Sequence, residues 1–200
     1  MHFLSIRMMN YGNALFENTG EIKAFQKVAL DYLHKEHKKD GSINPIPFTT
    51  FDVGANKGGY AKACLDIVRK TFTLSTSYKW YSFEPSPNTY EKCKDTLKDY
   101  PDTHIVQLAL SDSIGIARFR VSHADFLGTN GLLTDSEDLH HTETASEIKV
   151  PTTTIDQYIK DNNILNINFL KVDAEGFDLN VLKGAKESIS EGKIDAIQFE

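Results

Sequence analysis

The stretch FTTFDVGANKGGY, residues 48–60, carries the clearest structural signal in this 200-residue sequence. Its first four residues favour a β-strand, and a helical pattern of apolar side chains begins at Tyr60. The glycines between them predict a tight turn that joins a strand tip to a helix N-terminus. Free backbone N–H groups and the positive end of the helix dipole point into such a turn, which predicts a binding site for a polar or anionic group.

The glycine spacing in this turn indicates which class of ligand can bind. The dinucleotide fingerprint G-x-G-x-x-G has a glycine where this sequence has Asn56, so a pyrophosphate fits less well. S-adenosylmethionine (SAM) instead presents a carboxylate, an ammonium and a sulfonium, which suit a helix N-terminus with an acid nearby. Asp52 at the strand tip supplies this acid. The alternative is that Gly54 and Gly58 only permit a sharp turn between strand and helix.

The composition is that of a globular α/β domain. Hydrophobic residues make up 40% and charged residues 25% of the chain, which allows a substantial core. The net charge of −6 and the lack of a basic cluster argue against a nucleic-acid partner. Two cysteines are too few for a disulfide framework, and the apolar start is too short for a signal core or a membrane span. We therefore expect a cytoplasmic protein without a membrane span.

Two further segments are predicted to be strands that end near a carboxylate. Residues 79–84 end at Glu84, and residues 104–110 are followed by Asp112. Because the carboxyl ends of parallel strands share one edge of a sheet, we expect these acids to lie near Asp52. Glu84 is expected to accept hydrogen bonds from ribose hydroxyls, and Asp112 to meet the exocyclic amine of an adenine. The alternative for Glu84 is a solvent-exposed side chain at a strand end.

The chain before the first strand is predicted to be a separate extension. Apolar residues at helical spacing predict an amphipathic helix over residues 19–38. We therefore expect an N-terminal extension of residues 1–47 and a domain over residues 48–200.

Two short β-like runs, residues 114–121 and 148–154, are predicted to pair as a hairpin above the donor site. Between them, residues 122–147 form a polar insert that we expect to lack regular structure. An insert of this kind is either a functional lid or a disordered segment, and we favour a lid on the acceptor side. The adjacent His140 and His141 suggest a metal, but adjacent histidines cannot share a helix face, so no metal site is expected.

A fourth strand is predicted over residues 167–173, followed by one helix whose apolar face runs from Leu179 to Ile189. Asp173 and Glu175 lie in the turn between the strand and the helix. Either carboxylate could take the proton of an acceptor hydroxyl, and the alternative is that both only position donor or acceptor. The sequence lacks the D/N-P-P-Y/F element that serves amino nitrogens of bases, which favours oxygen as the acceptor atom.

Six segments resemble, in this order, the FkbM family of SAM-dependent methyltransferases: FDVGANKGGYA, YSFEPSPNTYEKC, ALSDSIGIARF, TTTIDQYI, FLKVDAEGFDLNVLKGA and IQFE. The resemblance implies a class I, Rossmann-like α/β fold with a doubly wound, mostly parallel sheet of strand order 3-2-1-4-5. It also implies SAM as donor and a hydroxyl acceptor on a sugar, glycan or small metabolite. The expected donor-binding residues are Asp52, Gly54, Ala55, Asn56, Gly58, Glu84, Ser111, Asp112 and Asp173, and the expected catalytic residues are Asp173 and Glu175.

The sequence departs from this family at its end. The family's domain normally continues past the fifth strand into an antiparallel pair, whereas this sequence stops at Glu200, inside the expected fifth strand, so we expect a fragment. Two other classes of protein remain as alternatives. One is an NAD(P)-dependent oxidoreductase, which Asn56 and the lack of an evident Tyr-Lys or His pair disfavour. The other is a non-catalytic interaction module.

Overall fold

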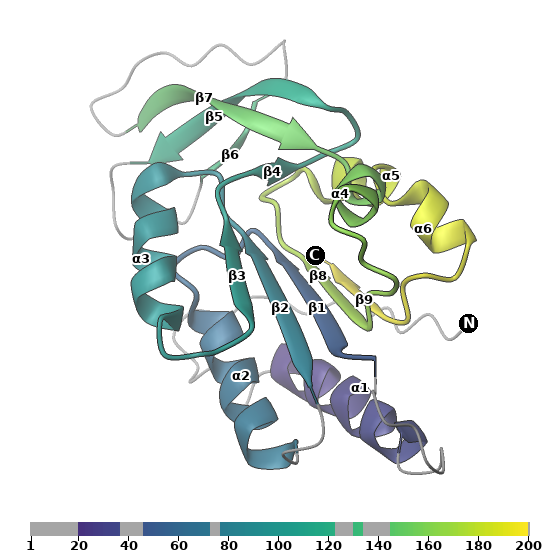
Figure 1. Cartoon of the computed structure of the whole chain (residues 1–200). Coiled ribbons are helices and arrows are strands. Elements are labelled where there is room, and N and C mark those ends of the chain that lie inside the picture. Colours follow the sequence, from purple (N-terminus) through teal and green to yellow (C-terminus); the bar gives the residue numbers. More distant parts are fainter. Residues whose placement is uncertain (1–19, 37–45, 73–76, 123–129, 134–144, 200) are drawn as a thin grey trace.

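The computed structural model describes residues 20–36, 46–72, 77–122, 130–133 and 145–199. Its centre is a five-stranded parallel sheet with the strand order β3-β2-β1-β8-β9 (Figure 1). These strands are β1 (Phe48–Val53), β2 (Tyr78–Phe83), β3 (Thr103–Val106), β8 (Phe169–Val172) and β9 (Ile197–Phe199). Numbered among themselves in chain order, they follow the order 3-2-1-4-5, which confirms the expected doubly wound sheet.

Helices cover both faces of this central sheet. The helices are α1 (Gly20–Glu36), α2 (Gly59–Thr71) and α3 (Pro87–Leu97) on one face, and α4 (Ile155–Asp161), α5 (Asp178–Lys183) and α6 (Lys186–Ser190) on the other (Figure 1). Successive residues of a strand point to opposite faces, so β1 supplies both cores. Phe48 packs on the side of α1, and Phe51 packs on the side of α4. None of the described helices is long and apolar enough to cross a membrane.

Helix α1 packs into the first of these cores. It is the amphipathic helix that we expected ahead of the first strand. Ile22 and Phe25 are 1% and 0% exposed. The ring of Phe25 meets Phe48, Trp80 and Phe169 edge to face, at centroid distances of 5.9, 5.6 and 5.4 Å. The helix therefore stabilises the same core as the central strands, and the domain boundary at position 47 stays a prediction.

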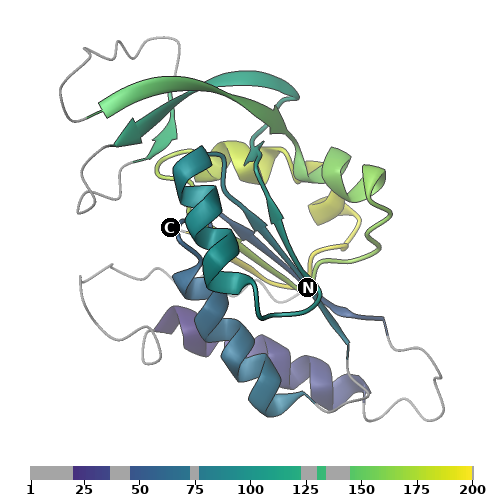
Figure 2. The same cartoon turned by 60° about the vertical axis from the view of Figure 1, so that its left-hand side comes forward.

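A second sheet lies across the carboxyl edge of the central sheet (Figure 2). Its strand order is β4-β7-β5-β6. These strands are β4 (Ala109–Leu110), β5 (Gly115–Ser122), β6 (Gly131–Leu132) and β7 (Ala145–Thr153). β5 and β7 pair in antiparallel fashion from Gly115 opposite Thr152 to Ser122 opposite Ala145, which confirms the expected hairpin.

Part of the insert between β5 and β7 has regular structure. Leu132 pairs with Phe119, so that β6 extends the second sheet. The expectation of an insert without regular structure is therefore wrong at this point. Residues 123–129 and 134–144, which include His140 and His141, lie outside the described residues.

The single strand expected over residues 104–110 is divided between the two sheets. β3 ends at Val106, and the amide of Leu108 donates a hydrogen bond of 3.0 Å to the Val106 carbonyl oxygen. After this sharp turn, Ala109 pairs with Thr152 of β7. An apolar run does not reveal such a change of sheet, because apolar residues lie on both sides of the turn.

The helix expected after the fourth strand is also divided in two. α5 ends at Lys183, and α6 begins only at Lys186. The carboxylate of Asp156 accepts hydrogen bonds from the amides of Glu187 and Ser188, so it satisfies the first N–H groups of α6. Leu179, expected on the apolar face, is 62% exposed. The prediction of one continuous amphipathic helix is therefore wrong.

Replacing Phe25 by alanine tests the packing of α1. We expect Phe25→Ala to lower the free energy of unfolding by about 3–5 kcal/mol, because it leaves a cavity in a close-packed aromatic cluster. Urea denaturation followed by circular dichroism measures this loss. The matched control is Lys27→Ala on the same helix, where an exposed side chain pairs only with Asp31 on the surface. Equal stability of the two variants would contradict the packing described here.

Candidate active site

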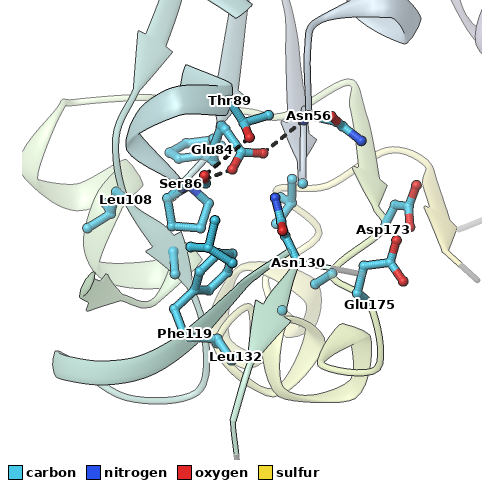
Figure 3. Close-up of a pocket in the computed structure, with 18 of the residues that line it drawn as sticks. Asn56, Glu84, Ser86, Thr89, Leu108, Phe119, Asn130, Leu132, Asp173 and Glu175 are labelled. Carbon is cyan, nitrogen blue, oxygen red and sulfur yellow. Dashed lines mark hydrogen bonds between the residues drawn. The ribbon is translucent and has the colours of Figure 1, made fainter. Parts of the chain in front are cut away.

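The structure has a cleft at the carboxyl edge of the central sheet, between this sheet and the second one (Figure 3). Its volume is about 270 Å³, near the lower end of the range for small-molecule sites. Residues that follow β1, β2 and β8 line it from the central sheet, and residues of β5 and β6 line it from the second. The first turn of α3 closes one side.

The turn after β1 lies directly against the end of β8. Gly54 has a φ of +77°, and a Cβ atom at this position would lie 1.9 Å from the carbonyl oxygen of Asp173. Both the backbone conformation and the lack of space require glycine here. The amides of Gly54 and Ala55 donate to the carbonyl oxygen of Phe83, each at 3.1 Å, which ties the turn to β2. The tips of three neighbouring strands are therefore held together.

Glu84 follows β2 directly, and its side chain points into the cleft (Figure 3). The residue is 5% exposed. Its Oε2 accepts a hydrogen bond of 3.0 Å from the amide of Asn56, and its Oε1 accepts one of 2.9 Å from the amide of Ser86. Burial raises the pKa of Glu84 to about 7, although the two amides favour the ionised form. Each oxygen of the ionised carboxylate keeps a lone pair for a ligand.

The first turn of α3 adds polar groups beside Glu84. Ser86 is the N-cap of this helix, and the Oγ1 of Thr89 lies 3.2 Å from the Oγ of Ser86. Ser86, Asn88, Thr89 and Lys92 line the cleft. The sequence predicted this helix, but it did not predict that residues of the helix line the cleft. The Ser86-Pro87 helix start, two residues after Glu84, is the signal that could have found these residues.

The turn after β8 carries Asp173 and Glu175 on the side of the cleft opposite Glu84 (Figure 3). The Asp173 side chain is 37% exposed, and Glu175 is exposed. Positive φ angles of 49° at Glu175 and 94° at Gly176 turn the chain sharply here. The two carboxylates expected to act in catalysis therefore line one cleft together with Glu84.

Asp52 lies behind the cleft and does not line it. It is 0% exposed, and its Oδ1 lies 3.5 Å from the Nζ of Lys171 on the neighbouring strand. The same ammonium lies 3.3 Å from Oδ2 of Asp173 and 5.0 Å from the ring centre of Tyr60 in α2. Burial raises the pKa of Asp52, against the effect of the ammonium. Burial lowers the pKa of Lys171, but the charges of Asp52 and Asp173 outweigh it and raise that pKa.

Ser111 and Asp112 also lie away from the cleft lining. They follow β4 in the second sheet, because the chain leaves the central sheet after Val106. Asp112 accepts a hydrogen bond of 2.8 Å from the side-chain amide of Asn180 in α5. This placement does not favour the expected contact with an adenine. In the glycine turn, Gly54 and Asn56 line the cleft, whereas Ala55 and Gly58 are buried outside it.

The second sheet gives the cleft an apolar wall. Phe119 and Leu132 face the cleft, and Leu108 borders it from the turn after β3 (Figure 3). Asn130 lies between Glu84 and the turn after β8, and its Oδ1 accepts a hydrogen bond of 2.7 Å from the amide of Ser122. No sequence motif marks these residues. Within the described ranges, no three His, Cys, Asp or Glu side chains are grouped so that they could hold a metal.

This arrangement of sheet, glycine turn and cleft is that of a Rossmann-like α/β domain. Residues 52–200 match the sequence model described as "Methyltransferase FkbM domain". The chain belongs to this methyltransferase family, as the six sequence segments indicated.

Two curated relatives fit this assignment. The chain is 29% identical over 140 residues to the hexuronic acid methyltransferase AglP of Haloferax volcanii, a match that covers 70% of this chain and 50% of AglP. It is 22% identical over 195 residues to the 2-O-methyltransferase NoeI of Sinorhizobium fredii, a match that covers 94% of this chain and 73% of NoeI. The chain thus spans half the length of the first relative.

Gly54→Ala tests the contact between β1 and β8. We expect this variant to lose about 3 kcal/mol or more of unfolding free energy, because the new methyl group meets the Asp173 carbonyl and the backbone is strained. The control is Gly115→Ala, where a Cβ atom meets nothing within 4 Å. Thermal unfolding compares the two variants, and a Gly54→Ala protein as stable as Gly115→Ala would disprove the close approach.

Proposed function

We propose that this domain is a SAM-dependent methyltransferase that methylates a hydroxyl oxygen on a sugar, glycan or small metabolite. The observation that carries the proposal is the buried Glu84 carboxylate at one side of the cleft, opposite a turn with two more carboxylates. The names of the relatives support the acceptor class, because one specifies a hexuronic acid and the other a 2-O position.

The residues of the cleft fit the chemical groups of SAM. The two free lone pairs of Glu84 suit the two ribose hydroxyls, and Leu108, Phe119 and Leu132 offer apolar surface to an adenine ring. Because Gly54 has no side chain and no room for one, only backbone atoms would lie beside the ligand at this point of the cleft. On the opposite side, the Asp173 carboxylate suits the positive sulfonium.

The same geometry disfavours a dinucleotide. A pyrophosphate is bound by free amides of the glycine turn, but the amide of Asn56 already donates to Glu84. The charge of Glu84 would also lie close to such a pyrophosphate. We therefore favour the methyltransferase over the NAD(P)-dependent oxidoreductase.

Bound SAM supplies an electrophilic methyl carbon on a sulfonium. Glu84 fixes the ribose, and the wall of the second sheet keeps water from the reacting atoms. The Asp173 carboxylate would face the positively charged sulfonium of the bound donor. Glu175, exposed at the mouth of the cleft, is placed to take the proton of the acceptor hydroxyl and so make its oxygen a better nucleophile.

The pKa of Glu84 makes ligand binding depend on pH. Ribose hydroxyls donate to the ionised carboxylate, and with a pKa of about 7 the ionised fraction falls about tenfold between pH 8 and pH 6. We expect the affinity for S-adenosylhomocysteine (SAH), the product form of the donor, to fall about tenfold over this range. Isothermal titration calorimetry measures it, with NAD as a ligand that should not bind.

Glu84→Gln separates this effect from other titrations. The amide cannot ionise, so its SAH affinity should be low and should not change between pH 6 and pH 8. A wild-type affinity that is equal at both pH values would refute the role of Glu84, and NAD binding without SAH binding would refute the proposed function.

Glu175→Gln tests the proposed proton acceptor. We expect methyl transfer to slow by about 100-fold, because the acceptor hydroxyl keeps its proton, while the SAH affinity stays within about twofold. The assay measures transfer of a labelled methyl group from SAM to a panel of uronic acid glycosides and neutral hexose glycosides. An unchanged rate on an acceptor that the wild type methylates would remove Glu175 from the mechanism.

A further inference from the structure

A row of buried polar side chains crosses the central sheet behind the cleft. Asp52 of β1 is the register partner of Ser82 in β2 and of Lys171 in β8, and Lys171 is the register partner of Gln198 in β9. These four residues are at most 7% exposed. Lys171 connects the row to the cleft, because its ammonium lies 3.3 Å from Asp173.

Within the described part of the chain, no hydrogen bond reaches either carboxylate oxygen of Asp52. The Lys171 ammonium at 3.5 Å is therefore the group that balances its charge. A buried carboxylate without such a partner would be costly, and so would a buried ammonium. Asp52 and Lys171 thus stabilise each other, and Asp173 is a second carboxylate that forms an ion pair with the same ammonium.

The charges of these three groups add up to −1. If Asp52 carried no charge, Lys171 and Asp173 would form a neutral pair at the cleft. With Asp52 ionised, the negative charge of Asp173 is left for a ligand. Asp52 does not line the cleft, but its charge can therefore decide how much negative charge Asp173 presents to a ligand there.

We propose that Asp52 acts on the donor through Lys171: it neutralises the buried ammonium, so that the Asp173 carboxylate keeps its negative charge for the ligand and the cleft holds the cationic donor more tightly than the neutral product. This inference rests on the proposed function, because SAM carries a sulfonium and SAH a neutral thioether. Asp52 is in this sense a positioning residue, which acts through another residue and not by contact. The loss of the positive charge on methyl transfer then weakens binding and favours release of the product.

Comparing SAM and SAH binding by calorimetry in three variants tests the proposal. Asp52→Asn keeps the shape of the side chain and removes its charge. We expect the preference for SAM over SAH to fall roughly fivefold, because a unit charge near the sulfonium is lost. The double variant Asp52→Asn, Lys171→Met removes both charges of the buried pair and leaves Asp173 with its charge, so the preference should return to that of the wild type.

The matched control is Asp95→Asn, which removes one carboxylate that is 79% exposed and paired with Lys98 on α3. It should leave the preference unchanged. A purely structural role of Asp52 would weaken SAM and SAH binding equally, and this result would overturn the inference. So would a double variant with the same preference as Asp52→Asn. If the single variant does not fold, the double variant still tests the inference, since replacing a buried pair as a unit is tolerated far better than breaking it. A preference in the double variant that differs from that of the wild type would then overturn the inference.

The experiment also separates this inference from the proposed function. A wild-type protein that binds neither SAM nor SAH overturns the proposed function and the inference with it. A wild-type protein that binds both, with an unchanged preference in Asp52→Asn, overturns the inference alone.

Discussion

The parallel pairing of β1 with both β2 and β8 is the constraint on which the site depends. The register places Asp52 beside Ser82 on one side and Lys171 on the other, so the three strands end at the same level. Their tips then approach so closely that only glycine fits at position 54. Residues far apart in the chain meet at one cleft because these three backbones are in register, and the second sheet covers the edge that they form.

The buried charges strengthen this register. Lys171 lies on the face of β8 that α2 covers, next to Asp52 and Tyr60. A shift of one residue along β8 would turn its ammonium toward the opposite face, where Leu170 and Val172 pack into an apolar core. A lone ammonium there would be costly, so the buried pair of Asp52 and Lys171 also specifies how the strands align.

Local signals in the sequence predicted the strands at the centre of the main sheet. The apolar runs, the glycine turn and the acid after β2 predicted the strands and the position of Glu84, whereas the strand order came from the resemblance to the FkbM family. The divided strand at Val106 could not be predicted, because an apolar run has the same sequence pattern in one sheet as in two. For this reason Ser111 and Asp112 were expected at the cleft, whereas Leu108 borders it. Asp52 was expected at the donor site, whereas it lies behind the cleft lining, and the pattern gave no sign of its contact with Lys171.

The wall of the cleft comes from a segment that is inserted as one piece. β4 to β7 follow each other between the third and fourth strands of the central sheet, and their cluster around Phe119, Leu132 and Val150 is distinct from the two cores of that sheet. Substitutions in this segment can therefore reshape one half of the cleft while the strand tips of the other half stay in place. Such a modular layout allows related proteins to diverge in what they recognise while they retain a shared chemistry.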